Sequence, residues 1–168
     1  MALLFDLDEN GKERTVWNGK LVNVPHRVHV AEDGKRVVTI DTYGPPSDEH
    51  VVVVYDEKGK VLADYKPEDL LSQQEIDFIP YTTAHQLTPH ATFAFSPSEK
   101  PKQFLVTVKR SETFTAALRL LNERLPSALT DSARESTVKR IEQVQTALEG
   151  PKERVIKIDL ESGKILAE

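Results

Sequence analysis

The sequence predicts an α+β fold built mainly from antiparallel β-hairpins, arranged as a meander sheet with units that are similar to propeller blades. Three observations support this prediction. One hairpin pattern occurs four times, a short helix follows its third copy, and two amphipathic helices precede its fourth copy. The chain has 168 residues, a length that suits one well-cored domain, so we expect residues 1–168 to fold as a single domain.

The repeated pattern consists of an apolar strand, an acidic or polar turn, the pair Gly-Lys and a second strand. Its four copies span residues 4–17, 28–41, 52–65 and 155–168. A tight hairpin needs a positive φ near the end of its turn, which glycine adopts without steric cost. We therefore expect positive φ at Gly11, Gly34, Gly59 and Gly163. Two interpretations stay open: ordinary hairpin turns used repeatedly, or blade-like units of one curved sheet or of a propeller fragment.

The third copy begins in a run of four valines, Val51 to Val54, which is apolar on both faces of a strand. A strand of this kind is buried on both faces and lies centrally in its sheet. We expect helices to cover one face. The loop that carries Phe93 and Phe95, or a second subunit, is expected to cover the other, so a homodimer is predicted if that loop does not.

The helical segments have recognisable start and stop signals. The stretch Lys66 to Pro80 contains a capping box from Ser72 to Glu75 and predicts a short helix or two helical turns. Residues 111–150 predict two helices joined as an αα-hairpin, the second with a capping box from Ser132 to Glu135. Their apolar stripes are expected to pack on one face of the sheet, with a partner-binding groove as the alternative.

Strands are predicted on either side of this helical excursion. Thr92 to Ser96 and Phe104 to Val108 have strand patterns. After the helices, Ile156, Ile158 and Leu160 alternate on one face. We expect this last hairpin to be buried on one side and to pair within the same sheet as the first three.

Composition and charge exclude several classes of function. Lys and Arg number 22 against 27 Asp and Glu, giving a formal charge of −5 without a basic cluster, which argues against nucleic-acid binding. The absence of cysteine excludes disulfides, thiolate nucleophiles and cysteine-bound zinc. No apolar run reaches the roughly 20 residues of a membrane helix. The N-terminal stretch lacks the basic region of a signal peptide.

Residues 20–80 contain a longer pattern: a strand that ends in Asp33-Gly34-Lys35, the sequence VVTID, the valine-rich strand, the turn DEKGK and the acidic stretch EDLLSQQEI. This pattern resembles one found in uncharacterised bacterial proteins, often exported, that carry propeller-like β-hairpin repeats. The resemblance favours an exported or periplasmic location with a leader removed over a cytoplasmic one. It implies no activity and no catalytic residues.

Two classes of function remain. The favoured one is a non-catalytic binding or protein-interaction module, because the sequence has no Walker, G-x-S-x-G or H-E-x-x-H motif. The alternative is a metal-dependent or hydrolase-like enzyme that uses loop histidines with Asp or Glu residues, a combination suited to zinc or to acid–base chemistry. His26 and His29 are not expected to form a metal pair, since i and i+3 of a strand point to opposite faces.

No catalytic residue, metal ligand or cofactor is predicted. Trp17 either anchors a ligand or partner or belongs to the core, and His85 and His90 either approach His50 and nearby acids or are solvated loop residues. The candidate ligand- or partner-binding residues are Trp17, Tyr43, His50, His85, His90, Phe93 and Phe95.

Overall fold

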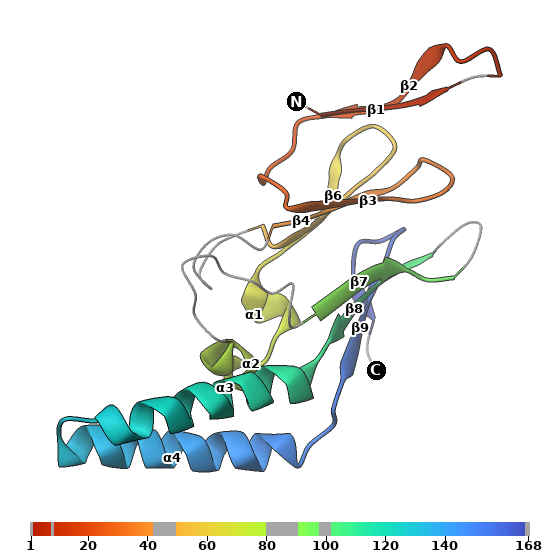
Figure 1. Cartoon of the computed structure of the whole chain (residues 1–168). Helices are drawn as coiled ribbons and strands as arrows, with labels where there is room; N and C mark the ends of the chain where they lie inside the picture. Colours follow the sequence, from red (N-terminus) through yellow and green to blue (C-terminus); the bar gives the residue numbers. More distant parts are fainter. Residues whose placement is uncertain (1, 8, 42–49, 80–90, 98–101, 167–168) are drawn as a thin grey trace.

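A computed structural model describes residues 2–7, 9–41, 50–79, 91–97 and 102–166. These residues form an α+β structure with ten strands in three antiparallel sheets and four α-helices, which confirms the predicted class. The three sheets lie one above the other, and two long helices extend from the lowest sheet to one side (Figure 1). The described strands form open sheets, and they do not close into a propeller.

The strands group into sheets as follows. Sheet 1 is the hairpin of β1 (Ala2–Leu7) and β2 (Glu13–Gly19). Sheet 2 contains β3 (Arg27–Val30), β4 (Val37–Ile40), β5 (Val52–Tyr55) and β6 (Val61–Tyr65) in sequence order. Sheet 3 has the order β10-β9-β8-β7, with β7 (Ala91–Phe95), β8 (Gln103–Val108), β9 (Arg154–Asp159) and β10 (Ile165–Leu166).

The prediction of one common sheet is therefore wrong. The last hairpin, β9 and β10, pairs with β8 of sheet 3 rather than with the first three hairpins. Its predicted burial on one side is confirmed, since Ile156, Ile158 and Leu160 are all buried. The alternation of the strand is local information, whereas the identity of its neighbour depends on the whole chain.

The four valines are buried on both faces, and β5 is an inner strand of sheet 2, as predicted. The covers agree with the prediction in part: Phe93 and Phe95 do pack with this strand, but on the same face as the helical residues, and the other face is covered by Trp17. Val52 and Val54 pack with sheet 3, in one core cluster that includes Phe104 and Val106. Val53 faces the other way and packs with Trp17 of sheet 1. Leu70 and Ile76, from the helical segment after β6, pack against the same cluster as sheet 3, whereas the cluster around Val53 contains no residue of a described helix.

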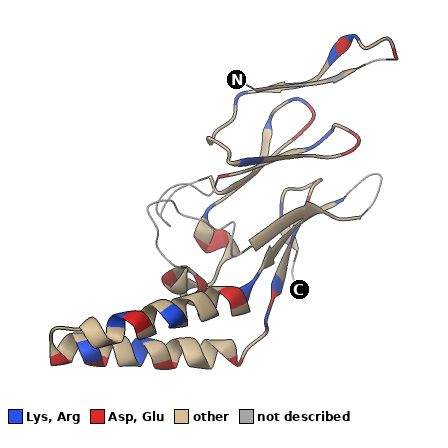
Figure 2. Cartoon of the chain, viewed as in Figure 1, with Lys and Arg blue, Asp and Glu red and all other residues tan. Residues whose placement is uncertain are grey.

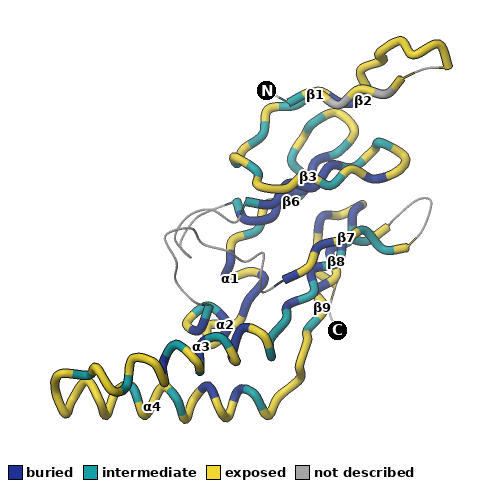
Figure 3. Tube along the Cα trace, viewed as in Figure 1, coloured by how far each residue is buried: buried dark blue, intermediate teal, exposed yellow. Residues whose placement is uncertain are grey.

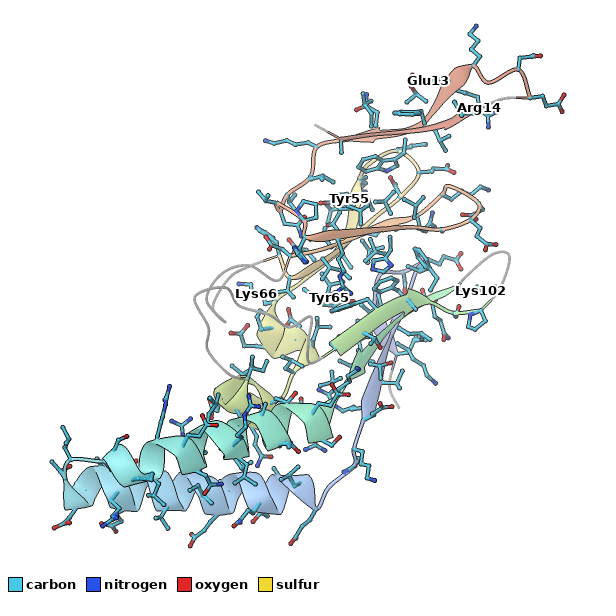
Figure 4. The ribbon with its side chains drawn as sticks, viewed as in Figure 1. Glu13, Arg14, Tyr55, Tyr65, Lys66 and Lys102 are labelled. Atoms are coloured by element: carbon cyan, nitrogen blue, oxygen red, sulfur yellow. The ribbon has the colours of Figure 1, made fainter. Side chains whose placement is uncertain are left out.

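Three further contacts join sheets 2 and 3. Arg36 Nε donates to the carbonyl of Leu160 at 2.7 Å, and the Tyr65 hydroxyl donates to the carbonyl of Gly163. Tyr65 lies between the two sheets in Figure 4. The ring of His29 meets the ring of Phe104 edge-on at 5.3 Å between centroids. Sheets 2 and 3 thus share one core and several polar contacts at its border.

The turn glycines adopt the predicted conformation, with φ between +68° and +77° at all four positions. Three of them also approach another hairpin: Gly34 faces the side chain of Val16, and the other two face a backbone. A Cβ on Gly59 would lie 2.5 Å from the carbonyl oxygen of Asn18, and one on Gly163 would lie 2.7 Å from that of Leu62. Glycine is thus required at these turns both for φ and for the close approach of two backbones.

Two short helices follow β6, as predicted: α1 (Pro67–Leu70) and α2 (Gln73–Phe78). The long helices α3 (Arg110–Arg124) and α4 (Asp131–Leu148) are joined by a 3-10 turn, Leu125–Ser127. The N-cap of α4 differs from the prediction. Thr130, rather than Ser132, caps α4 by accepting a hydrogen bond from the Ala133 amide, so Ser132 lies inside the helix. Thr130 meets the same chemical requirement two residues earlier.

The helical hairpin does not pack on a sheet face, which corrects the prediction. Its apolar residues form a separate cluster in which Phe114, Leu121 and Val144 pack with Phe78 of α2. The end of the hairpin farthest from the sheets is mostly exposed (Figure 3). Both helices lie between β8 and β9, whose ends pair directly at Val108 and Arg154. Among the described helices, none combines the length and apolar character needed to cross a bilayer.

Candidate functional site

Glu75 of α2 is the centre of the junction between the sheets and the helical hairpin. Its carboxylate is buried, and its Oε2 atom lies 2.6 Å from Nη2 of Arg154 at the start of β9. Its Oε1 atom lies 3.2 Å from Nε of Arg110, the first residue of α3, in ion-pair range but without hydrogen-bond geometry. Ser72 completes the site, since its backbone amide donates to Oε2 at 2.8 Å. One carboxylate therefore ties α2 to both α3 and β9.

Several opposing effects determine the charge of Glu75. Burial by itself raises the pKa of the carboxyl, but the hydrogen bond from Arg154, the bonds from Ser72 and the charge of Arg154 together lower it below its ordinary value of 4.5. Glu75 is therefore ionised at neutral pH and neutralises positive charge at the junction. This arrangement fixes α2 against α3, which is the condition for a groove of constant shape between them.

A groove lies where α2 meets α3 and α4. One part is a cavity of about 180 Å³, and a more polar hollow of about 540 Å³ adjoins it. Asp77, Phe78 and Arg140 line both parts. The remaining residues of the cavity are Ile79, Ala117, Leu120, Leu121 and Arg124, and those of the hollow are Gln74 and Gln143. We refer to these residues together as the α2 groove.

The floor of the α2 groove is the ring of Phe78, which is 6% exposed and meets Phe114 edge-on at 6.1 Å. Arg140 lies over this ring, with Cζ 5.6 Å from the centroid, and its Nη2 donates to the carbonyl of Asp77 at 3.3 Å. These contacts hold one guanidinium at the rim through a cation–π interaction and a hydrogen bond. The site thus combines a fixed aromatic floor with a fixed positive group.

Arg124, in the last turn of α3, is the second guanidinium of the cavity. It is exposed and forms no ion pair with any residue in the described part of the chain. Both signs of charge occur along α3 and α4 (Figure 2), whereas Asp77 is the only acid among the described residues that line the groove. The Asp77 carboxylate accepts from Gln73 Nε2 at 2.8 Å. Chemically, the groove can accept an apolar side chain together with a carboxylate.

The sequence-predicted residues lie elsewhere. Trp17 is 3% exposed, meets Tyr55 edge-on at 5.7 Å and donates its indole N–H to the carbonyl of Asp56, which is the core role left open above. Tyr55 lies between sheets 1 and 2 (Figure 4). Phe93 belongs to β7 and to the main core, and Phe95 packs against that core, so neither is on a loop.

His50 has φ of +73°, and its Nδ1 lies 2.6 Å from Oδ2 of Asp64 in β6. Its carbonyl accepts from Asn23. His50 therefore connects β6 to the chain segment before β3, and it lines neither part of the α2 groove. Tyr43, His85 and His90 lie outside the described residues. In the described ranges, no three His, Asp or Glu side chains form a group that would hold a metal ion.

Sequence analysis missed Phe78, Arg124 and Arg140. Phe78 was part of a predicted helix. Arg124 and Arg140 are more than forty and more than sixty residues away from it in the chain, and neither belongs to a local motif. Only the packing of α2 on the helical hairpin brings them together. Comparison of the chain with models of known families, with curated proteins and with solved structures gave no match.

Proposed function

We propose that the protein is a non-catalytic interaction module that binds a short peptide segment of a partner protein in the α2 groove. The recognised segment presents one large apolar side chain next to one or two carboxylates. The observation that carries this proposal is the pair of guanidinium groups, Arg124 and Arg140, at the rim of a cavity with an aromatic floor.

The size of the cavity favours a side chain over a free small molecule. Pockets for drug-sized ligands occupy about 300–1,000 Å³. The apolar cavity at Leu121 and Phe78 measures about 180 Å³, and the larger volume of about 540 Å³ belongs to the adjoining hollow, so the apolar part has room for a side chain only. The adjoining hollow is lined by Gln74, Asp77, Arg140 and Gln143 around the same Phe78 ring. An extended peptide places its apolar side chain in the cavity and its polar backbone over these amides.

The charges favour an acidic segment. Arginine presents a planar fork of donors that matches a carboxylate, and it loses less hydration than lysine when it binds one. Arg140 is already held by Phe78 and by the Asp77 carbonyl, so ordering it on binding costs little side-chain entropy. The enzyme alternative needs histidines and a carboxylate in one concavity, and the described residues that line this groove include no histidine.

A binding assay with defined probes tests the proposal. The probe is a fluorescein-labelled peptide with a central leucine and glutamates on both sides, and its counterpart has lysines instead of glutamates. Fluorescence polarisation should show binding of the glutamate peptide alone. Arg140→Glu and Arg124→Glu should each weaken it about tenfold or more, since one charge-assisted contact contributes about 1.5–3 kcal/mol.

Arg134→Glu is the matched control, because Arg134 is also exposed on α4 but lines neither part of the groove. It changes the net charge by the same amount and should leave the affinity within about twofold. Equal binding of the lysine peptide, or an equal loss of affinity in Arg134→Glu, would show that the α2 groove is not the binding site.

A further inference from the structure

The tripeptide Asn-Gly-Lys occurs twice in the N-terminal hairpin. The first copy, residues 10–12, lies between β1 and β2, and the second, residues 18–20, begins inside β2. The other two asparagines of the chain precede Val24 and Glu123. An asparagine that precedes glycine reacts most readily with its own backbone, because glycine has no side chain to shield the amide nitrogen. From the local sequence alone, the two copies should be equally reactive.

The turn copy lies outside the ladder of sheet 1. Pairing of β1 with β2 ends at Leu7 and Glu13, and Asn10 lies beyond that pair, at the outer tip of the hairpin (Figure 1). Asn10 and Gly11 are both exposed. A Cβ added to Gly11 would meet nothing within 4 Å. Rotation of the backbone at this turn therefore requires no strand pair to open.

The strand copy has the same three residues on a confined backbone. Asn18 pairs with Leu3 of β1, and Gly19 pairs with Ala2. A Cβ added to Gly59 would lie 2.5 Å from the carbonyl oxygen of Asn18 and 2.8 Å from Cα of Gly19, so the β5–β6 turn packs directly on this backbone. Asn18 is exposed, as Asn10 is. The two asparagines therefore differ in the freedom of their backbone and not in their access to solvent.

We propose that Asn10 is a site of spontaneous deamidation and that the fold protects Asn18 from the same reaction. The backbone nitrogen of Gly11 attacks Cγ of Asn10, so that a new N–Cγ bond forms and the Cγ–Nδ2 bond breaks. Nδ2 leaves as ammonia with the proton of the attacking amide. Water, the only co-reactant, then adds to either carbonyl of the five-membered succinimide ring and opens it to aspartate or isoaspartate.

Backbone geometry makes the reaction selective. Ring closure brings the nitrogen of the next residue onto Cγ, so ψ of the asparagine must leave the extended value of about +135° that antiparallel strands adopt. Asn18 can make this rotation only when β2 separates from β1 and from the β5–β6 turn. Such opening is infrequent in a paired and packed strand, whereas the tip of a loop moves readily. The reactive conformation is thus accessible to Asn10 while the rest of the chain stays folded.

The modification changes the hairpin in two ways. It adds one negative charge to a chain whose formal charge is already −5, and the isoaspartate product adds one carbon atom to the backbone of the turn. The length of a hairpin turn fixes the register of its two strands. The extra carbon should therefore loosen the pair of Leu7 and Glu13, which is the pair nearest the turn.

Incubation of the folded full chain at physiological temperature and slightly alkaline pH, followed by peptide mapping with mass spectrometry, tests the proposal. Each event raises the mass by the difference between water and ammonia, and electron-transfer fragmentation separates isoaspartate from aspartate. In the folded chain, Asn10 should react about tenfold or more faster than Asn18, because Asn18 must wait for local opening. In guanidinium chloride, the two rates should agree within about threefold, because the denatured chain has lost the ladder. A sample digested without incubation corrects for deamidation during digestion.

Two glutamine variants assign the products. Glutamine would have to form a six-membered ring and reacts far more slowly, so Asn10→Gln should remove most of the modification of the folded chain, and Asn18→Gln should leave it unchanged. Circular dichroism confirms that each variant is folded. Equal rates at the two sites of the folded wild-type chain, or a faster rate at Asn18, would overturn the proposal. The same holds if the folded chain reacts at neither site while the denatured chain reacts at both. Peptide binding in the α2 groove is measured separately and does not depend on this result.

Discussion

The guanidinium of Arg154, in the first residue of β9, lies 2.6 Å from the buried carboxylate of Glu75 in α2 and also donates to the carbonyl of Leu70 at 2.7 Å. Arg154 forms the end pair of the β8–β9 ladder, opposite Val108, the last residue of β8. The contact therefore joins the end of sheet 3 to α1 and α2, and α2 forms one side of the α2 groove. It makes the groove dependent on a residue of the C-terminal sheet.

Replacement of Glu75 tests this junction. Glu75→Ala leaves Arg154 and Arg110 without their carboxylate and should lower the free energy of unfolding by about 2–4 kcal/mol. Glu68→Ala in α1 is the control, because Glu68 is exposed, and it should cost less than about 0.5 kcal/mol. Urea denaturation of both variants at neutral pH gives the comparison. Equal midpoints would mean that the junction does not contribute to stability.

The same carboxylate predicts a loss of stability in acid. Since the folded pKa of Glu75 is below its ordinary value of 4.5, its contribution is fully present above that value and decreases as pH falls toward the folded pKa. Glu75→Gln should therefore show a weaker dependence of the urea midpoint on pH below about 4.5 than the wild-type chain. A wild-type slope that Glu75→Gln leaves unchanged would assign the acid sensitivity to other groups.

His29 predicts a second, less acidic region of pH dependence. Burial at the edge of sheets 2 and 3, and then the charge of Arg27, lower its pKa below 6.5. The unfolded chain consequently binds the proton at higher pH than the folded chain, so stability decreases as pH falls below 6.5. His29→Phe keeps the ring against Phe104 and should reduce this decrease. The exposed His26→Phe is the control and should retain it.

The close approach at Gly59 predicts different costs for two equivalent turns. Gly11 and Gly59 have φ of +75° and +77°, but a Cβ on Gly11 meets nothing within 4 Å, whereas one on Gly59 meets Asn18. Gly11→Ala should cost about 1–2 kcal/mol through its backbone conformation. Gly59→Ala should cost about 1–3 kcal/mol more, because sheet 1 must move away from sheet 2. Thermal unfolding of the pair, followed by Trp17 fluorescence, measures the difference.

Removal of the C-terminal hairpin tests whether the main core can fold without β9 and β10. A chain that ends at Gly150 lacks Ile156, Ile158 and Leu160, whose burial contributes roughly 5–9 kcal/mol as an upper estimate. This is comparable to the total stability of a domain, about 5–15 kcal/mol. The truncated chain should therefore lose its cooperative thermal transition in circular dichroism. A transition near that of the full chain would show that β9 and β10 are dispensable.

Local chemistry explains which features were predictable. The four turns were found because a positive φ favours glycine wherever the turn lies, and the capping box at Ser72 and Glu75 was found because its partners are three residues apart. The cap of α4 was missed by two residues, since both Thr130 and Ser132 have suitable hydroxyl groups. The strand alternation of Ile156 and Ile158 predicted burial on one face for the same local reason.

Long-range partners were not predictable. The valines of β5 indicate two buried faces, but an apolar face has no feature that distinguishes a sheet from a helix as its cover. For the same reason the sequence did not reveal that Trp17 covers Val53. The α2 groove combines residues of three helices, and Arg124 and Arg140 become candidate site residues only when packing places them around the same cavity as Phe78. The candidate site thus depends on tertiary packing throughout.

The position of α3 and α4 between two paired strands affects the order in which the chain folds. Pairing Val108 with Arg154 closes a long loop, and closure of a long flexible loop is entropically costly and slow. The two ends of the antiparallel helical hairpin already meet, because the Ser111 amide donates to the carbonyl of Lys152 at 3.0 Å. Helices rich in local contacts form rapidly. Early formation of this hairpin would bring the ends of β8 and β9 together. The loop that must then close for β8 to pair with β9 is effectively short, so this pairing is no longer slow.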